Sequence, residues 1–265
     1  KKIFSFIENV PPDINVIVIE NSNNIELKKK IESKYKNISV HLKENNGVSS
    51  SINFAAKHVK TKYFLQISPD VIFNFKDLNI FLDYAAKFNY KFAAIGPRFK
   101  NVEKKSHKQI SNNIEYDEIN SIHGSCMFIK KDCFDEIGGF DDKFFLYFEE
   151  TEYCYRAKKK GFLTYQINKS SVTSNGRSVE IKDSQHEDNF ANILIWHFIW
   201  SKFYFNKLRY GKLISLIIFI PLIIRIIFKL SFFRIINDKK KGNKYSFRLN
   251  GLVSSILNKK SNLRP

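Results

Sequence analysis

The sequence predicts an α/β fold followed by a helical tail that is both basic and apolar. Short runs of β-branched and apolar residues alternate with segments of helical periodicity, which is typical of a mixed, mostly parallel sheet flanked by helices. The chain has 265 residues, enough to bury a substantial core. We therefore expect an α/β domain over residues 1–185 and a membrane-associated helical tail over residues 186–265.

The expected strands are short and are bounded by turn residues. Residues 14–20 have the sequence INVIVIE, a continuous β-branched run that is typical of a strand buried on both faces. Similar runs predict further strands over residues 38–42, 63–67, 92–95 and 162–167, and residues 126–129 form another short apolar run.

The expected helices lie between these strands. Helical periodicity is present over residues 25–36, 50–58 and 77–88, and the last of these has an apolar stripe that we assign to the core. The stretch 99–121 is polar, basic and poor in apolar residues, so it predicts a long surface loop. Loops of that length are commonly functional, and a flap over a substrate site is one interpretation.

Three carboxylates open the next predicted helix. Glu149, Glu150 and Glu152 directly follow an aromatic cluster at residues 144–148, while lysines and a glycine mark the other end of the helix. The helix dipole favours ionised carboxylates at the helix start. An ionised carboxylate beside an aromatic-walled pocket suits a general base. The alternative is a helix terminus that is only well charged.

Polar residues follow two predicted strands at their carboxyl ends, where open α/β sheets bind ligands. Glu20, Asn21 and Ser22 come after the first strand, and the tripeptide Ser-Pro-Asp, which ends at Asp70, comes after the third. The proline stops a helix and leaves Asp70 at the strand end, where a carboxylate can hold a divalent cation. Ordinary turn chemistry is the alternative at both places.

The dipeptide Asn46-Gly47 is first of all a tight-turn signal. A helical pattern that contains Asn53 follows it, and not a second hairpin strand. The turn therefore leads into a helix N-terminus, where backbone N–H groups favour an anionic ligand.

Two segments of the chain, GSCMFIKK and IGGFDDKFFLYFEETEYCYRAKKKGF, resemble a long pattern in family-2 inverting glycosyltransferases, especially their rhamnosyltransferase-like branch. In that pattern Glu149 stands on a glutamate, and Glu150 stands on the aspartate that is the presumed catalytic base. Three earlier elements are also similar to the family: the acid Glu20, the Asn46-Gly47 turn and Asp70. The resemblance implies a GT-A fold, the fold of nucleotide-diphospho-sugar transferases.

The resemblance also implies roles for single residues. Glu150 would deprotonate an acceptor hydroxyl, Glu149 would orient the acceptor or the base, and Asp70 would hold Mg²⁺ or Mn²⁺ on the donor diphosphate. The donor, dTDP-rhamnose or a UDP-sugar, would pass its sugar to a hydroxyl of a cell-surface glycan or of a lipid-linked saccharide. Donor binding is implied for Glu20, Asn21, Ser22, Asn46, Gly47, Asn53 and Gly124.

The sequence also departs from the family pattern. Thr173 and Ser174 stand where members commonly carry a histidine near the metal. Arg177 could compensate by binding phosphate, and a solvated arginine is the alternative. The given sequence begins without a strand that ends in Thr-Tyr-Asn, so we expect it to enter the fold at its first helix. Either that strand lies outside the given sequence, or the protein is a catalytically inactive homologue, which is an alternative function.

The charge distribution favours an anionic membrane surface as a partner. The net charge is +18, and residues 186–265 hold fifteen Lys or Arg against three Asp or Glu, a net of +12. These charges surround an apolar run and form no recognisable nucleic-acid module, so no nucleic-acid partner is expected. The three cysteines lack metal-ligand spacing and indicate a reducing compartment. We expect the cytoplasmic face of a membrane, with peripheral or C-terminal attachment.

Residues 213–224 form an uncharged apolar run, and the apolar character extends to Ile236 with three basic interruptions. A membrane span needs about 20 mostly apolar residues, so we favour an interfacial or partly inserted helix. A true span and a buried core or oligomer helix are the alternatives. A basic membrane-surface binding protein is then an alternative function for the whole chain.

Overall fold

A computed structural model describes residues 2–88, 92–100, 115–174 and 184–264. The chain forms two compact units. Unit 1 comprises residues 1–46, 50–140 and 150–179, and unit 2 comprises residues 47–49, 141–149 and 180–265. The helical unit 2 therefore incorporates two short segments from the first part of the chain. The domain boundary expected between residues 185 and 186 stays a prediction.

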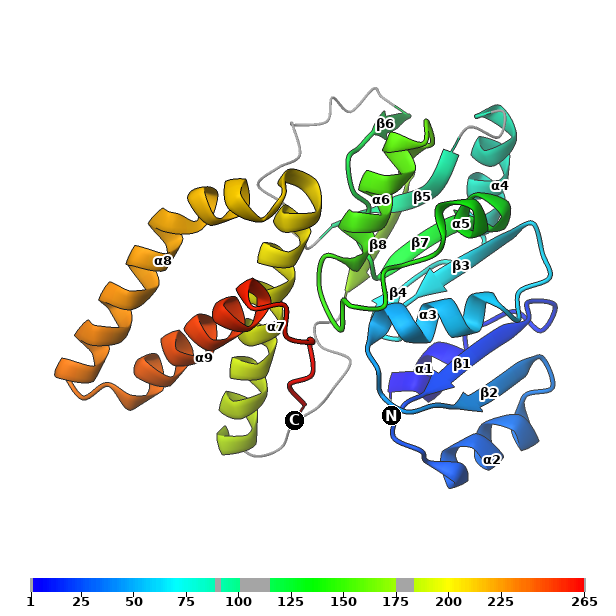
Figure 1. Cartoon of the computed structure of the whole chain (residues 1–265). Helices are drawn as coiled ribbons and strands as arrows, with labels where there is room; N and C mark the ends of the chain where they lie inside the picture. The colour runs from blue at the N-terminus through cyan, green and yellow to red at the C-terminus, as the bar shows by residue number, and fades with distance from the viewer. Residues whose placement is uncertain (1, 89–91, 101–114, 175–183, 265) are drawn as a thin grey trace. The chain divides into compact units, whose positions relative to one another are not determined.

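The main sheet of unit 1 has six strands, with the order β3-β7-β5-β8-β4 and with β6 paired to β8 (Figure 1). Strands β5 and β7 are almost entirely buried, as their apolar runs predict. The strands are β3 (Tyr63–Ile67), β4 (Val71–Ile72), β5 (Phe92–Phe99), β6 (Tyr116–Glu118), β7 (Cys126–Lys130) and β8 (Leu163–Ser174).

The expected mixed sheet is confirmed, but the expectation that it is mostly parallel is wrong for these six strands. The β5–β8 pair is parallel, whereas the pairs β3–β7, β5–β7, β4–β8 and β6–β8 are antiparallel. A strand buried on both faces is a continuous apolar run whichever way its neighbours point. The sequence pattern could therefore indicate the strands but not their directions.

Helices cover both faces of this sheet. Along β7, Met127 and Ile129 pack into a core with α3 (Val48–Ala56), α5 (Lys131–Ile137) and α6 (Glu149–Lys159). Cys126 and Phe128 point to the opposite face, into a second core with α4 (Asp77–Lys87). This alternation is the period of two that a strand imposes on its side chains. The result is a three-layer α/β arrangement within unit 1.

A smaller parallel sheet completes unit 1 (Figure 1). It pairs β1 (Val16–Glu20) with β2 (Ile38–Leu42), and α1 (Lys2–Ile7) and α2 (Ile25–Lys34) supply its helices. Ile7, Ile31, Ile38 and Val40 form its buried core. The side chain of Asn24 caps α2 by accepting a hydrogen bond from the backbone N–H of Leu27.

Several predicted elements end within two residues of the observed ones, and the strands at 38–42 and 63–67 are confirmed to the residue. Other elements were missed. Strand β6 lies inside the stretch expected to be loop, and α5 follows β7 directly where no helix was expected. Strand β8 continues to Ser174, well beyond the expected end at residue 167. Residues 101–114 of the expected loop and Arg177 lie outside the described residues.

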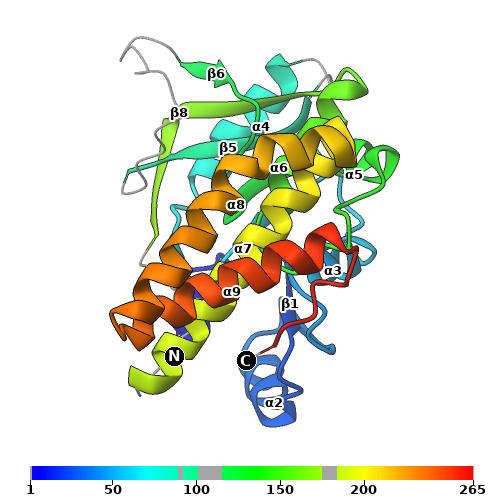
Figure 2. The same cartoon turned by 60° about the vertical axis from the view of Figure 1, so that its left-hand side comes forward.

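The helical part of unit 2 consists of α7 (Ser184–Tyr210), α8 (Lys212–Ile235) and α9 (Lys239–Ile256), which pack side by side (Figure 2). Ile199, Phe203, Phe219, Ile226 and Leu252 form their shared core. Gly251 lets α9 approach α7 closely, since a Cβ there would lie 2.7 Å from the carbonyl oxygen of Trp196. The short apolar helix expected near residues 252–257 is the end of the longer α9.

Helix α8 is the one helix among the described residues that is long and apolar enough to cross a membrane. Only 22% of its most apolar window is buried within the structure. Leu213, Ile217, Ile224, Phe228 and Ile235 are each more than 60% exposed. Length and composition alone are weak support for a span, because a core helix passes the same test.

Residues 258–264 dock onto α7 through a buried histidine. The ring nitrogens of His197 lie 2.9 Å from Ser261 Oγ and 2.8 Å from the carbonyl oxygen of Leu263. A carbonyl can only accept, so the neutral ring donates from Nε2 and accepts at Nδ1. Burial lowers the pKa of His197 to about 4, the bond to Leu263 opposes the lowering, and the charge of Arg264 adds to it.

As the pH falls from about 6.5 to about 4, we expect the free energy of unfolding to decrease because of His197. The unfolded histidine titrates near 6.5 and the folded one near 4, so within this window the unfolded state binds the extra proton. Acidification from pH 7.5 to 5 should therefore lower the free energy of unfolding by about 2 kcal/mol through this residue. Urea denaturation of wild type and His197→Gln at both pH values measures the difference, and equal pH slopes would contradict the assignment.

A second prediction concerns Arg156, which ties α6 to the end of α5. Its guanidinium bonds both carboxylate oxygens of Glu152, at 2.6 and 2.8 Å, and the carbonyl oxygens of Ile137 and Gly139, each at 2.6 Å. The Glu152 side chain is only 5% exposed, so Arg156→Ala would leave a buried charge without its partner. We expect a loss of about 3 kcal/mol in the free energy of unfolding.

The matched control for Arg156 is Lys158→Ala on the same helix. Lys158 pairs with Glu118 at 3.3 Å, but both side chains are about half exposed. An exposed pair contributes about 0 to 1 kcal/mol, so this variant should unfold almost like wild type. Similar losses in the two variants would show that the Arg156 fork does not hold α6.

Candidate active site

Asp70 lies at the carboxyl end of β3, between β3 and β4, as the sequence predicted. It is 9% exposed, and the hydroxyl of Ser174 donates a hydrogen bond of 2.8 Å to its Oδ2. Ser174 reaches Asp70 because β4 pairs with the end of β8, with Val71 opposite Ser174. Members of the family that the sequence resembles commonly carry a histidine in this segment. In this chain Ser174, a residue of the same segment, contacts Asp70.

The turn at Gly124 reaches the same end of β3. The backbone N–H of Ser68 donates to the carbonyl oxygen of Ser125 at 2.9 Å. The N–H of Ser125 bonds Nδ1 of His123 at 3.2 Å, and the His123 ring stacks on Phe99 at 4.1 Å between centroids. These contacts fix the segment 123–125, which we call the glycine turn, beside the tripeptide that carries Asp70. His123 lies beside the site and was not among the predicted site residues.

Glu150 packs against the other side of the glycine turn. A Cβ placed on Gly124 would lie 3.4 Å from Cγ and 3.5 Å from Cδ of Glu150. The hydroxyl of Thr151 donates to Oε1 of Glu150 at 3.3 Å and also bonds the hydroxyl of Ser121 at 3.0 Å. Glu150 stands in the first turn of α6, where the helix dipole favours its ionised form. Asp70, Gly124 and Glu150 are therefore joined through one short turn.

Glu20, Asn21 and Ser22 lie at the carboxyl end of β1. The carboxylate of Glu20 accepts hydrogen bonds from the N–H and hydroxyl of Ser22 and from the N–H of Asn24. Burial opposes its ionisation, but these bonds and the N–H of Asn23 outweigh burial and hold the pKa of Glu20 below its usual value. The carboxylate of Glu20 is thus negatively charged and held in place, so it can accept hydrogen bonds from the hydroxyl groups of a ligand.

The helix that follows Asn46-Gly47 contributes to two different places. Asn21 Nδ2 donates to Ser51 Oγ at 3.2 Å, so α3 contacts the end of β1. The amide of Asn53 bonds both backbone groups of Phe140, at 2.8 and 2.9 Å. In the structure Asn53 therefore holds the turn before the acidic helix, and its predicted contact with the donor stays a prediction.

Two of the predicted site residues belong to unit 2. Gly47 has a φ of +96°, and a Cβ there would meet the carbonyl oxygen of Phe145 at 2.5 Å. Glycine is therefore required by both conformation and space. Glu149 is 8% exposed and directly precedes Glu150 in the chain. Asn46, the last residue before Gly47, donates its N–H to the carbonyl oxygen of Glu44 at 2.9 Å.

The residues around Asp70 fit a divalent cation that takes most of its ligands from a substrate. No group of three or more His, Cys, Asp or Glu residues that could hold a metal lies within the described part of the chain. Mg²⁺ commonly uses one or two carboxylates together with substrate phosphates, so a single nearly buried aspartate with a neighbouring hydroxyl is a sufficient protein contribution.

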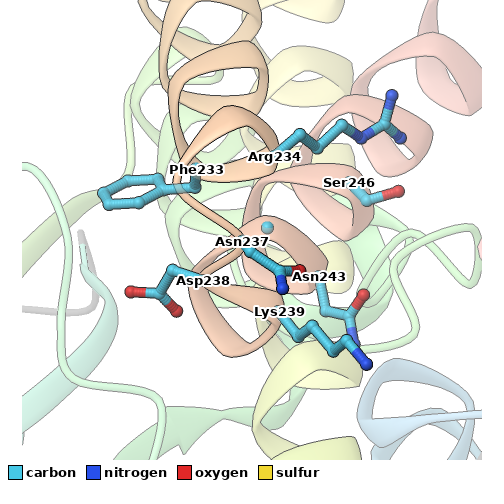
Figure 3. Close-up of a pocket in the computed structure, with 8 residues that line it drawn as sticks. Phe233, Arg234, Asn237, Asp238, Lys239, Asn243 and Ser246 are labelled. Carbon is cyan, nitrogen blue, oxygen red and sulfur yellow. The ribbon is translucent and has the colours of Figure 1, made fainter.

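A pocket of about 250 Å³ lies elsewhere, at the turn between α8 and α9 in unit 2 (Figure 3). It contains none of the predicted site residues. Its lining residues are mostly polar and carry both charges: Phe233, Arg234, Asn237, Asp238, Lys239, Gly242, Asn243 and Ser246.

Comparison with known proteins bears on the family and on the fold. The sequence pattern of glycosyl transferase family 2 matches residues 2–151, more than half of the chain. The fold is that of the mannosyltransferase PcManGT from Pyrobaculum calidifontis, whose structure contains GDP-Man and Mn²⁺. That alignment has a TM-score of 0.54 and 10% identity, and it covers 98% of this chain and 84% of the other.

Two curated relatives match over short stretches. A low-salt glycan biosynthesis hexosyltransferase of Haloferax volcanii is 45% identical over 42 residues, which are 16% of this chain and 14% of that protein. An N-acetylglucosaminyl-diphospho-decaprenol L-rhamnosyltransferase of Mycobacterium tuberculosis is 31% identical over 51 residues, 19% of this chain and 17% of that protein. The matched stretches thus span less than a fifth of either relative.

The long pattern match and the shared fold lead to one assignment. Unit 1 presents Asp70 and Glu150 around a glycine turn in a GT-A-like α/β fold with a mixed sheet. The chain belongs to glycosyl transferase family 2.

Proposed function

We propose that the protein is an inverting glycosyltransferase that moves a sugar from a nucleoside-diphosphate donor to an acceptor hydroxyl. The observation that carries the proposal is the placement of Asp70 and Glu150 against the same glycine turn. A diphosphate held at Asp70 and an acceptor at Glu150 would have the anomeric carbon between them. Transfer in one in-line step then inverts the anomeric centre.

Glu150 is the proposed general base. Its carboxylate accepts the proton of the acceptor hydroxyl while that oxygen attacks the anomeric carbon and the nucleoside diphosphate leaves. The helix dipole favours negative charge in the first turn of a helix, and a carboxylate that carries that charge can accept a proton. Glu149, the preceding residue, is proposed to orient the acceptor or the base.

Asp70, supported by Ser174, is the proposed protein ligand of Mg²⁺ or Mn²⁺. When bound, the cation supplies positive charge that stabilises the leaving diphosphate. Glu20, Asn21 and Ser22 are proposed to bind the nucleoside, because the ordered carboxylate of Glu20 can accept hydrogen bonds from sugar hydroxyls or base N–H groups. Asn46, Gly47, Asn53 and Gly124 complete the proposed donor-binding set.

The proposed donors are dTDP-rhamnose or a UDP-sugar, and the proposed acceptor is a lipid-linked saccharide or a cell-surface glycan. The short match to a rhamnosyltransferase that acts on a diphospho-decaprenol saccharide supports this choice. The match to a glycan biosynthesis hexosyltransferase supports the broader class.

An anionic membrane surface is the proposed partner of α8. Its exposed side chains are apolar, and Arg225, Lys229 and Arg234 interrupt them with positive charge. Its buried face packs on α9, whose first half is rich in lysine. A spanning α8 would draw those charges into hydrocarbon, which is unfavourable. Attachment in the interface, at the cytoplasmic face of the membrane, avoids this penalty.

The first test of the proposal is metal-dependent nucleotide binding. Wild type should bind UDP, dTDP or GDP in calorimetric titrations with Mn²⁺ and at least about ten-fold more weakly without it. Asp70→Asn should lose the metal dependence. The matched control is Asp77→Asn, because Asp77 also accepts a hydrogen bond from a β8 serine, Ser170, at 2.7 Å. If the two variants showed the same dependence of nucleotide affinity on Mn²⁺, Asp70 would not be the metal ligand.

The second test separates catalysis from binding. Glu150→Gln keeps the size of the side chain but cannot take a proton, so turnover should fall by about 10²-fold to 10⁴-fold. Nucleotide affinity should stay within about two-fold of wild type, since the base acts on the acceptor. Release of nucleoside diphosphate from dTDP-rhamnose, UDP-N-acetylglucosamine and GDP-mannose is the assay. Full turnover by the variant would exclude Glu150 as the base.

The third test concerns the membrane. Wild type should sediment with vesicles of phosphatidylglycerol and phosphatidylcholine, less so at high salt, because basic residues near anionic lipid are screened by ions. Ile217→Asp with Phe228→Asp should abolish sedimentation. Leu82→Asp, which changes an exposed apolar residue of unit 1, is the control. Unchanged binding by the double variant would show that α8 is not the attachment surface.

A further inference from the structure

The loop that precedes the acidic pair has an unusual backbone. Residues 141–148, which we call the acidic-pair loop, belong to unit 2 and lead directly into Glu149 and Glu150. Tyr147 and Phe148 each have a φ of 69°, in the left-handed region that bulky residues rarely adopt. Two such residues in succession persist only where the surroundings hold them in place.

Helix α7 holds the two left-handed residues by their rings. The ring of Phe198 lies 5.6 Å from that of Tyr147 and 5.6 Å from that of Phe148, measured between centroids. Phe148 also packs on Phe205 of the same helix at 5.8 Å. These are the separations of interacting aromatic pairs.

Helix α7 also holds the loop through hydrogen bonds. The buried hydroxyl of Ser201 donates to the carbonyl oxygen of Leu146 at 2.8 Å. The hydroxyl of Tyr204 donates to Oδ2 of Asp141, the first residue of the loop, at 2.8 Å. The first residue of the loop and Leu146 are thus bonded to side chains about one helical turn apart on α7.

The middle of the loop is held from two further directions. The carbonyl oxygen of Phe145 accepts a hydrogen bond of 2.9 Å from the N–H of Val48, next to Gly47. Its ring stacks on His197 of α7 at 4.6 Å, and the guanidinium of Arg264 lies 3.7 Å from the ring centroid. The docked segment 258–264 therefore contributes to the same support.

We propose that α7 holds the acidic-pair loop in a fixed conformation, and that Phe198, Ser201 and Tyr204 are positioning residues for Glu149 and Glu150. The inference rests on the proposed function, because general-base catalysis is the task that requires a carboxylate of the acidic pair to be placed accurately. It assigns the helical unit a part in turnover that is independent of any membrane contact. Catalysis is sensitive to small displacements of a base, so weakening the contacts between α7 and the loop should lower turnover more than it lowers nucleotide affinity.

The decisive variant is Ser201→Ala, with Ser255→Ala as its matched control. Ser255 is also a buried serine of unit 2 that donates to a backbone carbonyl, that of Trp200, at 2.9 Å. The two variants remove the same group from the same kind of bond, but only Ser201 reaches the acidic-pair loop. Ser201→Thr keeps the hydroxyl, so its turnover should be closer to that of wild type than the turnover of Ser201→Ala. Tyr204→Phe is a second loop variant should Ser201→Ala fail to fold.

Three readouts separate positioning from general damage. Release of nucleoside diphosphate from dTDP-rhamnose, UDP-N-acetylglucosamine and GDP-mannose gives kcat, and calorimetry with the nucleotide gives the affinity. Amide hydrogen exchange over residues 141–149 reports the loop without any substrate. We expect Ser201→Ala to lower kcat by about ten-fold, to leave nucleotide affinity within about two-fold and to speed exchange in the loop. Ser255→Ala should do none of these.

The inference is overturned if the two serine variants lower kcat equally, or if loop exchange in Ser201→Ala equals that of wild type. A fall in nucleotide affinity with unchanged kcat would also contradict it. Failure of the proposed function looks different, because wild type itself would then release no nucleotide from any donor. In that case the positioning role falls with it, while hydrogen exchange still decides whether α7 holds the loop.

Discussion

The candidate site depends above all on the antiparallel register of β3 against β7. Ile67 pairs with Cys126, so the residues that follow β3 and the residues that precede β7 must emerge at the same edge of the sheet. The bond between Ser68 and Ser125 extends that register by one step and fixes the glycine turn beside Asp70. The pairing of Val71 with Ser174 then brings the end of β8 to the carboxylate. A slip of one residue would turn every side chain of β7 to the other face and separate these groups.

The second constraint is the pair of supports around the acidic helix. Arg156 and Asn53 bind the backbone between Ile137 and Phe140, which ties the turn before the acidic-pair loop to unit 1. The loop itself packs on α7 and on the segment 258–264 within unit 2. The helical part of the chain thus combines two properties, an apolar face directed to solvent on α8 and a rigid support on α7. A function for this part beyond membrane attachment follows from the contacts of α7 alone.

The sequence predicted the longer strands of unit 1 and the ends at which polar residues gather, because buried strands and turns leave local composition signals. It could not give strand directions, since the apolar run of β7 has no direction, nor could it predict β6, whose three residues are too short for a period. Asp70, Gly124 and Glu150 were selected through the family resemblance, and their mutual contacts could not be read from spacing. Ser174, His123 and Ser201 were missed as partners because each acts through a contact with a residue distant in sequence. Single polar residues of this kind carry no periodic signal.

The most direct test of the account is the stereochemistry of turnover. The protein would be incubated with Mn²⁺ and dTDP-rhamnose, UDP-N-acetylglucosamine or GDP-mannose, and proton NMR would follow the first anomer of sugar released to water. We expect release from one donor with the anomeric configuration opposite to that of the donor, because a single in-line displacement inverts the centre. Release with retained configuration, or no release from any donor by folded protein, would contradict it.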